Sequence, residues 1–182
     1  MRKTTLPTVT LIFMLSLLVF GTTASAFEPN SKDKLELEVA AAIVDIKQTD
    51  PGIEDWFKGA AGYAVFPSVG EGAFVVGGAY GKGLVIANDV VVGTTSLSQV
   101  TVGLQMGGQA YSEFIFFRDE TALEDFKRGN FELGAQASAV AATAGASADA
   151  SYNKGVAIFT NVTGGLMYEA SVGGQKFKYT PK

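Results

Sequence analysis

Histidine and cysteine, the side chains that most often carry nucleophilic or metal chemistry, are both absent from the 182 residues. A Ser-His-Asp triad, a cysteine nucleophile and an imidazole or thiolate metal site are therefore excluded. An enzyme with this sequence would have to rely on carboxylates, lysine, serine or tyrosine. We identify no catalytic residue, metal ligand or cofactor motif, and we expect a protein that is not an enzyme.

Three short motifs have the spacing of known sites, and each has a simpler explanation. Ser151 and Lys154 match the S-x-x-K spacing of penicillin-recognising enzymes, but the S-D-N and K-T-G partner motifs are missing. The glycines at 70–72 and 77–78 match no nucleotide-binding motif and are expected in turns and bulges. The acidic residues of 119–125 lack the order of an EF-hand loop and are expected on a solvated helix face.

Trp56, Phe57 and Lys58 form the strongest candidate binding motif, an aromatic pair beside a lysine that can reach a membrane interface. The alternative is burial of both rings in the core. We predict that lipid contacts these three residues and three further lysines, Lys82, Lys176 and Lys178. A buried aromatic ring contributes about 1.5–3 kcal/mol and a lysine at an anionic surface roughly 1 kcal/mol, so we expect the rings to dominate.

The first 26 residues have the pattern of an export signal. Arg2 and Lys3 precede the apolar run 11–20, and Ala-Ser-Ala at 24–26 is a small-residue cleavage site. The apolar run is too short to span a bilayer as a helix. Cleavage after Ala26 leaves residues 27–182, enough for a single domain, which we expect to be periplasmic or secreted and to associate peripherally with a membrane.

The charge of the expected mature chain argues against nucleic acid as a partner. The sequence holds 14 basic and 18 acidic residues, and removal of Arg2 and Lys3 takes the net charge from −4 to −6. Phosphate binding needs a concentrated basic surface. Because there is no cysteine to form a disulfide, stability must come from packing.

Helical spacing governs the first third of the mature chain. Apolar residues recur at helical intervals from Leu35 to Ile46, with Ser31 as the predicted N-cap. Asp50 followed by Pro51 is a second helix start signal. A further short helix is predicted at about 120–128, with acidic residues in its first turn, basic ones in its last, and Gly129 after it.

From Gly62 onward the period changes to two, which predicts strands at about 62–67, 72–80 and 82–87, with Asn88-Asp89 as a turn. Val100, Val102, Leu104 and Met106 alternate with polar or glycine residues, which predicts one buried face. The run 111–117 is apolar on both faces and predicts a central strand. Alternating alanines at 135–152 favour a hairpin over a helix, with a turn at 141–142. Lys176 and Lys178 point to a charged edge strand at the C-terminus.

The segment 62–86 recurs in degraded form 93 positions later, at 155–177. Gly62 and Gly155, and Phe66 and Phe159, are among the matching pairs. Two copies are too few for a solenoid and suggest two halves of one sheet. We therefore predict an α+β domain in which N-terminal helices pack on a strongly bent antiparallel sheet or partial β-barrel built from two similar Gly-rich hairpin halves. The alternative is a small outer-membrane β-barrel with a structural role in the envelope.

Several stretches together resemble the SYLF-domain family. They are GYAVFP at 62–67, GAFVVGG at 72–78 with GKG at 81–83, VGLQMGGQ at 102–109, and Phe131–Gly134 with Gly155–Phe159. The resemblance runs in order over about residues 32–179 and rests on the combination of motifs.

The resemblance implies a lipid-binding module. Eukaryotic members bind phosphoinositides, yeast relatives bind actin, and bacteria carry exported stand-alone versions. Eukaryotic members are thought to touch membranes through a lysine-rich amphipathic N-terminal helix. The matching segment here, 31–48, holds Lys32, Lys34 and Lys47 among four acidic residues. The resemblance thus implies a non-catalytic protein that binds a lipid or a membrane surface.

Overall fold

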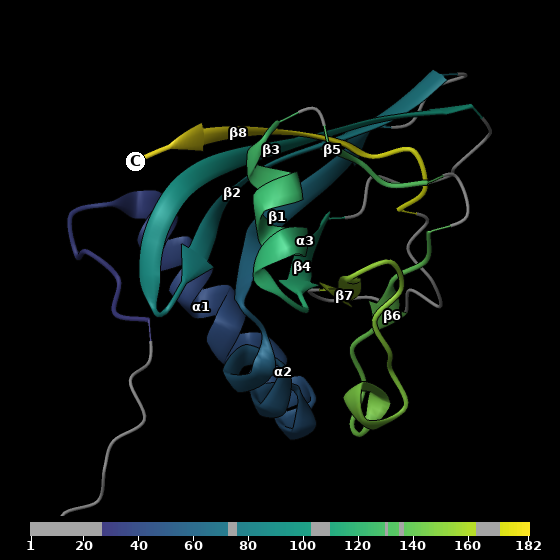
Figure 1. Cartoon of the computed structure of the whole chain (residues 1–182). Coiled ribbons are helices and arrows are strands. Elements are labelled where there is room, and N and C mark those ends of the chain that lie inside the picture. The colour runs from purple at the N-terminus through teal and green to yellow at the C-terminus, as the bar shows by residue number, and fades with distance from the viewer. Residues whose placement is uncertain (1–26, 73–75, 103–109, 130, 135–136, 163–171) are drawn as a thin grey trace, which may run out of the picture.

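The computed structural model describes residues 27–72, 76–102, 110–129, 131–134, 137–162 and 172–182. The export signal at 1–26 and the predicted strand positions Leu104 and Met106 lie outside the described residues. The described part is an α+β domain, as predicted, whose strands form one strongly curved, open sheet (Figure 1). Its elements in chain order are α1 Lys34–Thr49, η1 Pro51–Ile53, α2 Glu54–Gly59, β1 Gly62–Gly72, β2 Val76–Ala87, β3 Val90–Val102, β4 Ala110–Phe117, α3 Glu120–Lys127, β5 Phe131–Glu132, β6 Val140–Ala141, η2 Ala146–Ala148, β7 Val156–Val162 and β8 Lys176–Pro181.

The N-terminal helices form close to where the sequence places them. The N-cap of α1 is Asp33, whose carboxylate accepts hydrogen bonds from the backbone N–H groups of Leu35 and Glu36. The prediction of Ser31 as the cap is therefore wrong by two residues. Asp50 and Pro51 begin η1 as predicted, and α2 follows directly and ends at Gly59.

The sheet has the strand order β5-β8-β3-β2-β1-β4-β7-β6. Its pairs are antiparallel except β6–β7, which is parallel. β4 lies between β1 and β7 and is buried on both faces, which confirms the prediction of a central strand. One buried cluster lies between the sheet and α1, and the other lies on the face that carries Leu123 and Phe126 of α3.

β1 runs further than predicted, and the two strands predicted at 72–80 and 82–87 form the single strand β2. Pro67 lies where the β1 register shifts, and Gly83 continues β2 rather than ending it. A Cβ atom at Gly83 would collide with the carbonyl oxygen of Val65, so glycine here permits close approach of β1. The predicted turn is confirmed: Asn88 and Asp89 have φ of +50° and +61°, as a two-residue hairpin turn of this type requires.

The two sequence repeats enter the same sheet but differ in their pairing. β1 and β7 flank β4, and Val65 and Phe159 both pair with Phe114. Phe66 and Phe159 are therefore both fully buried, but on opposite faces of the sheet. In the described part of the chain, β8 pairs with β3 and β5, so it does not complete a second hairpin with β7.

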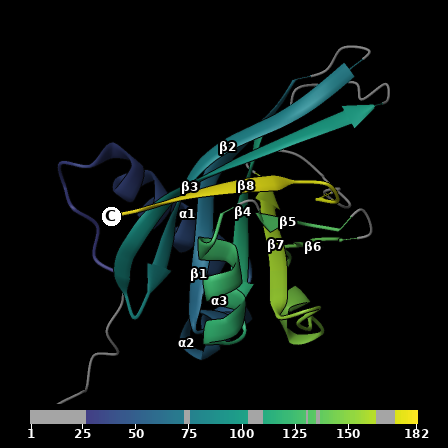
Figure 2. The same ribbon diagram turned by 45° about the horizontal axis from the view of Figure 1, so that its top comes forward.

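Two predictions for strand residues are wrong. The alanine-rich segment does not form a hairpin, because its described part contains only the two-residue β6 and the short η2. The 145–147 backbone instead donates hydrogen bonds to the buried carboxylate of Asp50. Val100, predicted on a buried face, is 77 % exposed because the ends of β2 and β3 extend past the helices (Figure 2).

Candidate functional site

Three of the predicted lipid-contacting lysines lie together on one face of the sheet. Lys82 on β2 and Lys178 on β8 both pair with Ser96 of β3, so the three residues share a row. Lys176 is two residues from Lys178 and therefore on the same face, about 7 Å along the strand. Adjacent strands are about 4.8 Å apart, so Lys82 lies roughly 10 Å from Lys178 across the sheet.

Two exposed apolar residues complete this surface. Tyr80 pairs with Ser98, which in turn pairs with Lys176, and Tyr80 is 54 % exposed. Val100 is two residues beyond Ser98 on β3 and is more exposed still. We call this surface the basic face and define it by Lys82, Lys176, Lys178, Tyr80 and Val100.

Side chains along a strand alternate between the two faces of the sheet, and this alternation explains why the basic face is exposed. The next row of the sheet, Gly81, Leu97 and Phe177, is buried on the opposite side. On the same side, the neighbouring positions Leu84 and Ile86 of β2 lie under α1. The basic face is thus the part of this sheet surface beyond the reach of the helices (Figure 2).

The charge on the basic face is only partly neutralised. Lys176 approaches Glu132 of β5 with 3.7 Å between nitrogen and oxygen, and both side chains are largely exposed. An exposed pair of this kind contributes little to stability and leaves Lys176 able to exchange partners. Among the described residues, Lys82 and Lys178 form no ion pair.

The structure places Trp56 and Phe57 away from the basic face, against the core under α2. The Trp56 indole N–H donates to the Ser147 carbonyl at 3.1 Å, and its ring contacts Phe159 at 5.1 Å between centroids. Phe57 makes edge contacts with Tyr63 and with Phe116, at 5.0 and 4.9 Å. Both rings are half-buried, so they pack against the core without the full burial that the sequence left open as the alternative.

Lys58 belongs to a small ion network beside Phe57. Glu54 accepts from Lys47 at 2.7 Å and lies 3.5 Å from Lys58. The hydrogen bond from Lys47, with the charges of both lysines, lowers the pKa of Glu54 below its usual value, although burial opposes this. Lys47 also lies over the Phe57 ring, 4.8 Å from its centroid.

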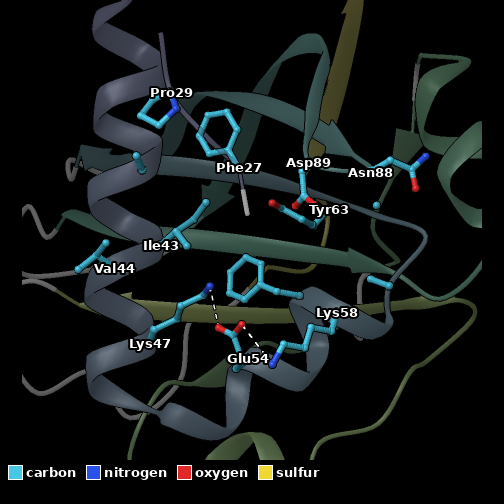
Figure 3. Close-up of a pocket in the computed structure, with 14 residues that line it drawn as sticks. Phe27, Pro29, Ile43, Val44, Lys47, Glu54, Lys58, Tyr63, Asn88 and Asp89 are labelled. Carbon is cyan, nitrogen blue, oxygen red and sulfur yellow. Dashed lines mark ion pairs between the residues drawn. The ribbon is translucent and has the colours of Figure 1, made fainter. Parts of the chain in front are cut away.

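A pocket of about 580 Å³ opens between α1, α2 and the β2–β3 turn (Figure 3). It has apolar walls with polar groups at its edges. The sequence gives no sign of this pocket, because its walls come from segments that are distant in the chain. Its lining residues are Phe27, Pro29, Ala40, Ile43, Val44, Lys47, Glu54, Phe57, Lys58, Ala60, Gly62, Tyr63, Asn88 and Asp89.

Glu113 and Gln175 form a buried polar pair on the face of the sheet that points away from α1. The Glu113 carboxyl has no exposed surface and accepts one hydrogen bond, from the Gln175 amide at 3.0 Å. Burial raises the pKa of Glu113 to about 8, although the Gln175 bond lowers it in part. Glu113 is therefore mostly protonated at neutral pH, a state that the strand pattern of the sequence does not reveal.

Comparison with known proteins relates the C-terminal half of this fold to a described family. Residues 98–180 match the family model Ysc84, described as "Las17-binding protein actin regulator". The chain is also 28 % identical over 138 residues to Beta cell expansion factor A of Aeromonas veronii, covering 75 % of this chain and 52 % of the relative. The chain thus spans about half the length of that relative. The resemblance to the SYLF family is confirmed by the family match.

Within the described residues, no helix combines the length and apolarity needed to cross a bilayer.

Proposed function

We propose that this protein is a non-catalytic lipid-binding domain that docks on anionic phospholipid surfaces through its basic face. The observation that carries the proposal is the gathering of three lysines with Tyr80 and Val100 on one uncovered part of the sheet. Lipid binding is also the function that the SYLF resemblance implies.

The sizes of the expected energy terms indicate that the lysines and the exposed apolar side chains both contribute to membrane binding. Each lysine near an anionic surface contributes roughly 1 kcal/mol. The net negative charge of the chain opposes this attraction only at close range, because salt screens charges beyond a Debye length of about 8 Å. Tyr80 and Val100 are already exposed, so their partial insertion removes apolar area from water without disturbing the core.

Trp56 and Phe57 are weaker candidates for insertion than the sequence suggests. Withdrawing either ring from its packing would forfeit core contacts that stabilise the fold, a loss typically of several kcal/mol. Their role in lipid binding stays a prediction. The basic face requires no such rearrangement, and we therefore assign it the main contact.

Vesicle co-sedimentation tests this proposal. The protein should bind vesicles of phosphatidylglycerol and phosphatidylcholine more tightly than vesicles of phosphatidylcholine alone. The double change Lys82→Gln and Lys178→Gln should weaken binding to the anionic vesicles about tenfold or more, since two contacts of roughly 1 kcal/mol are lost.

The matched control is Lys32→Gln with Lys34→Gln, two exposed lysines at the start of α1. It removes the same charge and should leave binding nearly unchanged. If this control weakens binding while the basic-face variant does not, the contact lies on the N-terminal helix, as the family resemblance implies for eukaryotic members.

We further propose that the chain is exported and that residues 1–26 are removed. The support is the basic, apolar and small-residue order of that segment. N-terminal sequencing of protein from the cell envelope should begin at Phe27. Recovery of the uncleaved chain in the cytoplasm would contradict this assignment.

A further inference from the structure

The pocket at α1 and α2 is a feature that the proposed function does not use. It lies beside the β2–β3 turn at Asn88 and Asp89, eight residues along β2 from Tyr80. At about 3.3 Å per residue, the two sites are roughly 25 Å apart. A ligand in the pocket would therefore not occupy the basic face.

An apolar stripe of α1 forms one wall of the pocket. Ala40, Ile43, Val44 and Lys47 line it at positions i, i+3, i+4 and i+7, which fall on a single side of a helix. The stripe is about 10 Å long and ends at a lysine. Phe27 and Pro29 line the pocket beside α1, at the end away from Lys47 and Lys58 (Figure 3).

The charged groups are separated along the pocket. Lys47, Glu54 and Lys58 gather at one end, where two ammonium groups share a single carboxylate. Asp89 lies at the other end, near Tyr63 (Figure 3). The lysine end therefore carries an excess of one positive charge, and it adjoins the end of the apolar stripe.

Tyr63 adds a polar group to the Asp89 end of the pocket. The residue is only 6 % exposed, it lines the pocket, and its hydroxyl has no hydrogen-bond partner among the described residues. Burial, together with the charges of Asp89 and Glu54, raises the pKa of this hydroxyl. It thus stays neutral and is able to donate a hydrogen bond.

We propose that this pocket binds one single-chain anionic amphiphile, such as a fatty acid. The hydrocarbon lies along Ala40, Ile43 and Val44, and the carboxylate pairs with Lys47 and Lys58. The volume is within the usual range for small-molecule sites, about 300–1,000 Å³. This proposal is independent of membrane docking by the basic face.

Isothermal titration with dodecanoate and with dodecyltrimethylammonium, both below their micelle concentrations, tests the proposal. The two probes have the same chain and opposite charge. Dodecanoate should bind saturably with one molecule per protein, and the cationic probe at least tenfold more weakly. Equal binding of the two probes, or no binding of dodecanoate, would overturn the proposal.

Variants locate the site. Ala40→Phe should fill the channel, and Val44→Glu should place a negative charge on the exposed part of the stripe; each should weaken dodecanoate binding at least tenfold. Circular dichroism checks that they fold, and Val44 is exposed enough that a change there spares the core. Lys178→Gln, on the basic face, should leave dodecanoate binding unchanged. Unchanged binding in folded Val44→Glu would place the amphiphile elsewhere.

Discussion

Two buried carboxylates show how differently the fold treats the same chemical group. Asp50 accepts hydrogen bonds from the backbone N–H groups of Ser147 at 2.7 Å and of Gly145 and Gly52 at 3.2 Å. Burial raises the pKa of Asp50, but these donors outweigh it and the net shift is downward. Glu113, with one amide donor, shifts the other way. The balance between burial and the number of hydrogen-bond donors therefore sets the direction of each pKa shift.

Glu113 should make stability depend on pH. Its pKa is about 8 in the folded protein against 4.5 for the unperturbed group, so the folded state holds a proton that the unfolded chain releases. The free energy of unfolding should be highest below about pH 4.5 and fall by up to about 1.4 kcal/mol per unit until about pH 8. Urea unfolding of wild type and Glu113→Gln from pH 5 to 9 measures this. The variant should lack the decrease, and parallel pH profiles would contradict the assignment.

Asp50 should be a major contributor to stability. Asp50→Asn removes the charge that accepts the Ser147 and Gly145 hydrogen bonds, and should lower the free energy of unfolding by about 2–3 kcal/mol. Asp45→Asn, at an exposed position of α1, is the control and should change it by less than about 0.5 kcal/mol. Equal urea midpoints for the two variants would show that the 145–147 loop does not depend on this anchor.

Among the helices, strands and turns, the sequence correctly predicted those whose conformation depends on residues close together in the chain. The Asn88-Asp89 turn needs two left-handed residues, α3 carries Glu120 in its first turn and Lys127 in its last, and 111–117 is apolar on both faces. The 135–152 segment could not be predicted in this way. Its 145–147 part is held by Asp50 and Trp56, which are about ninety residues away in sequence.

The flanking of β4 by β1 and β7 makes both repeat phenylalanines core residues. Phe66→Ala and Phe159→Ala should each lower the free energy of unfolding by about 3–5 kcal/mol, the usual cost of deleting a buried ring. Urea denaturation measures the change. A neutral result at either position would contradict the pairing of that strand.

A substitution at Gly83 tests whether β1 and β2 approach each other closely at this position. Gly83→Ala should destabilise the fold by about 1–3 kcal/mol, because its Cβ would meet the Val65 carbonyl and the Phe66 ring. Gly70→Ala is the matched control, since a Cβ there has open space around it. If thermal unfolding midpoints fall equally for both, strand propensity rather than packing explains the loss.

At the scale of the whole molecule, the sequence named lysines of the site but not their arrangement. Lys82 and Lys178 are 96 positions apart, and only the pairing of both strands with β3 brings them into one row. The pocket escaped prediction for the same reason. Tyr80 and Val100 were missed because an apolar residue in a strand pattern is normally expected in the core.

The placement of the site also changes the expected response to salt. Dominant insertion of Trp56 and Phe57 would leave vesicle binding nearly unaffected between about 0.1 M and 1 M salt, where the Debye length falls from roughly 10 to 3 Å. Binding through the basic face should instead weaken at least tenfold over this range. Co-sedimentation at graded salt distinguishes the two, and salt-independent binding would favour the aromatic pair.

The central claim is that the basic face, and no other surface, meets the membrane, and the absence of cysteine from the sequence allows a direct measurement. Single cysteines are introduced as Ser98→Cys on the basic face and as Thr121→Cys on α3, both exposed positions. Each is labelled with a polarity-sensitive fluorophore and mixed with phosphatidylglycerol vesicles. We expect a blue shift and brighter emission at position 98 and no change at 121. A response at 121, or none at 98 while the protein sediments with the vesicles, would contradict it.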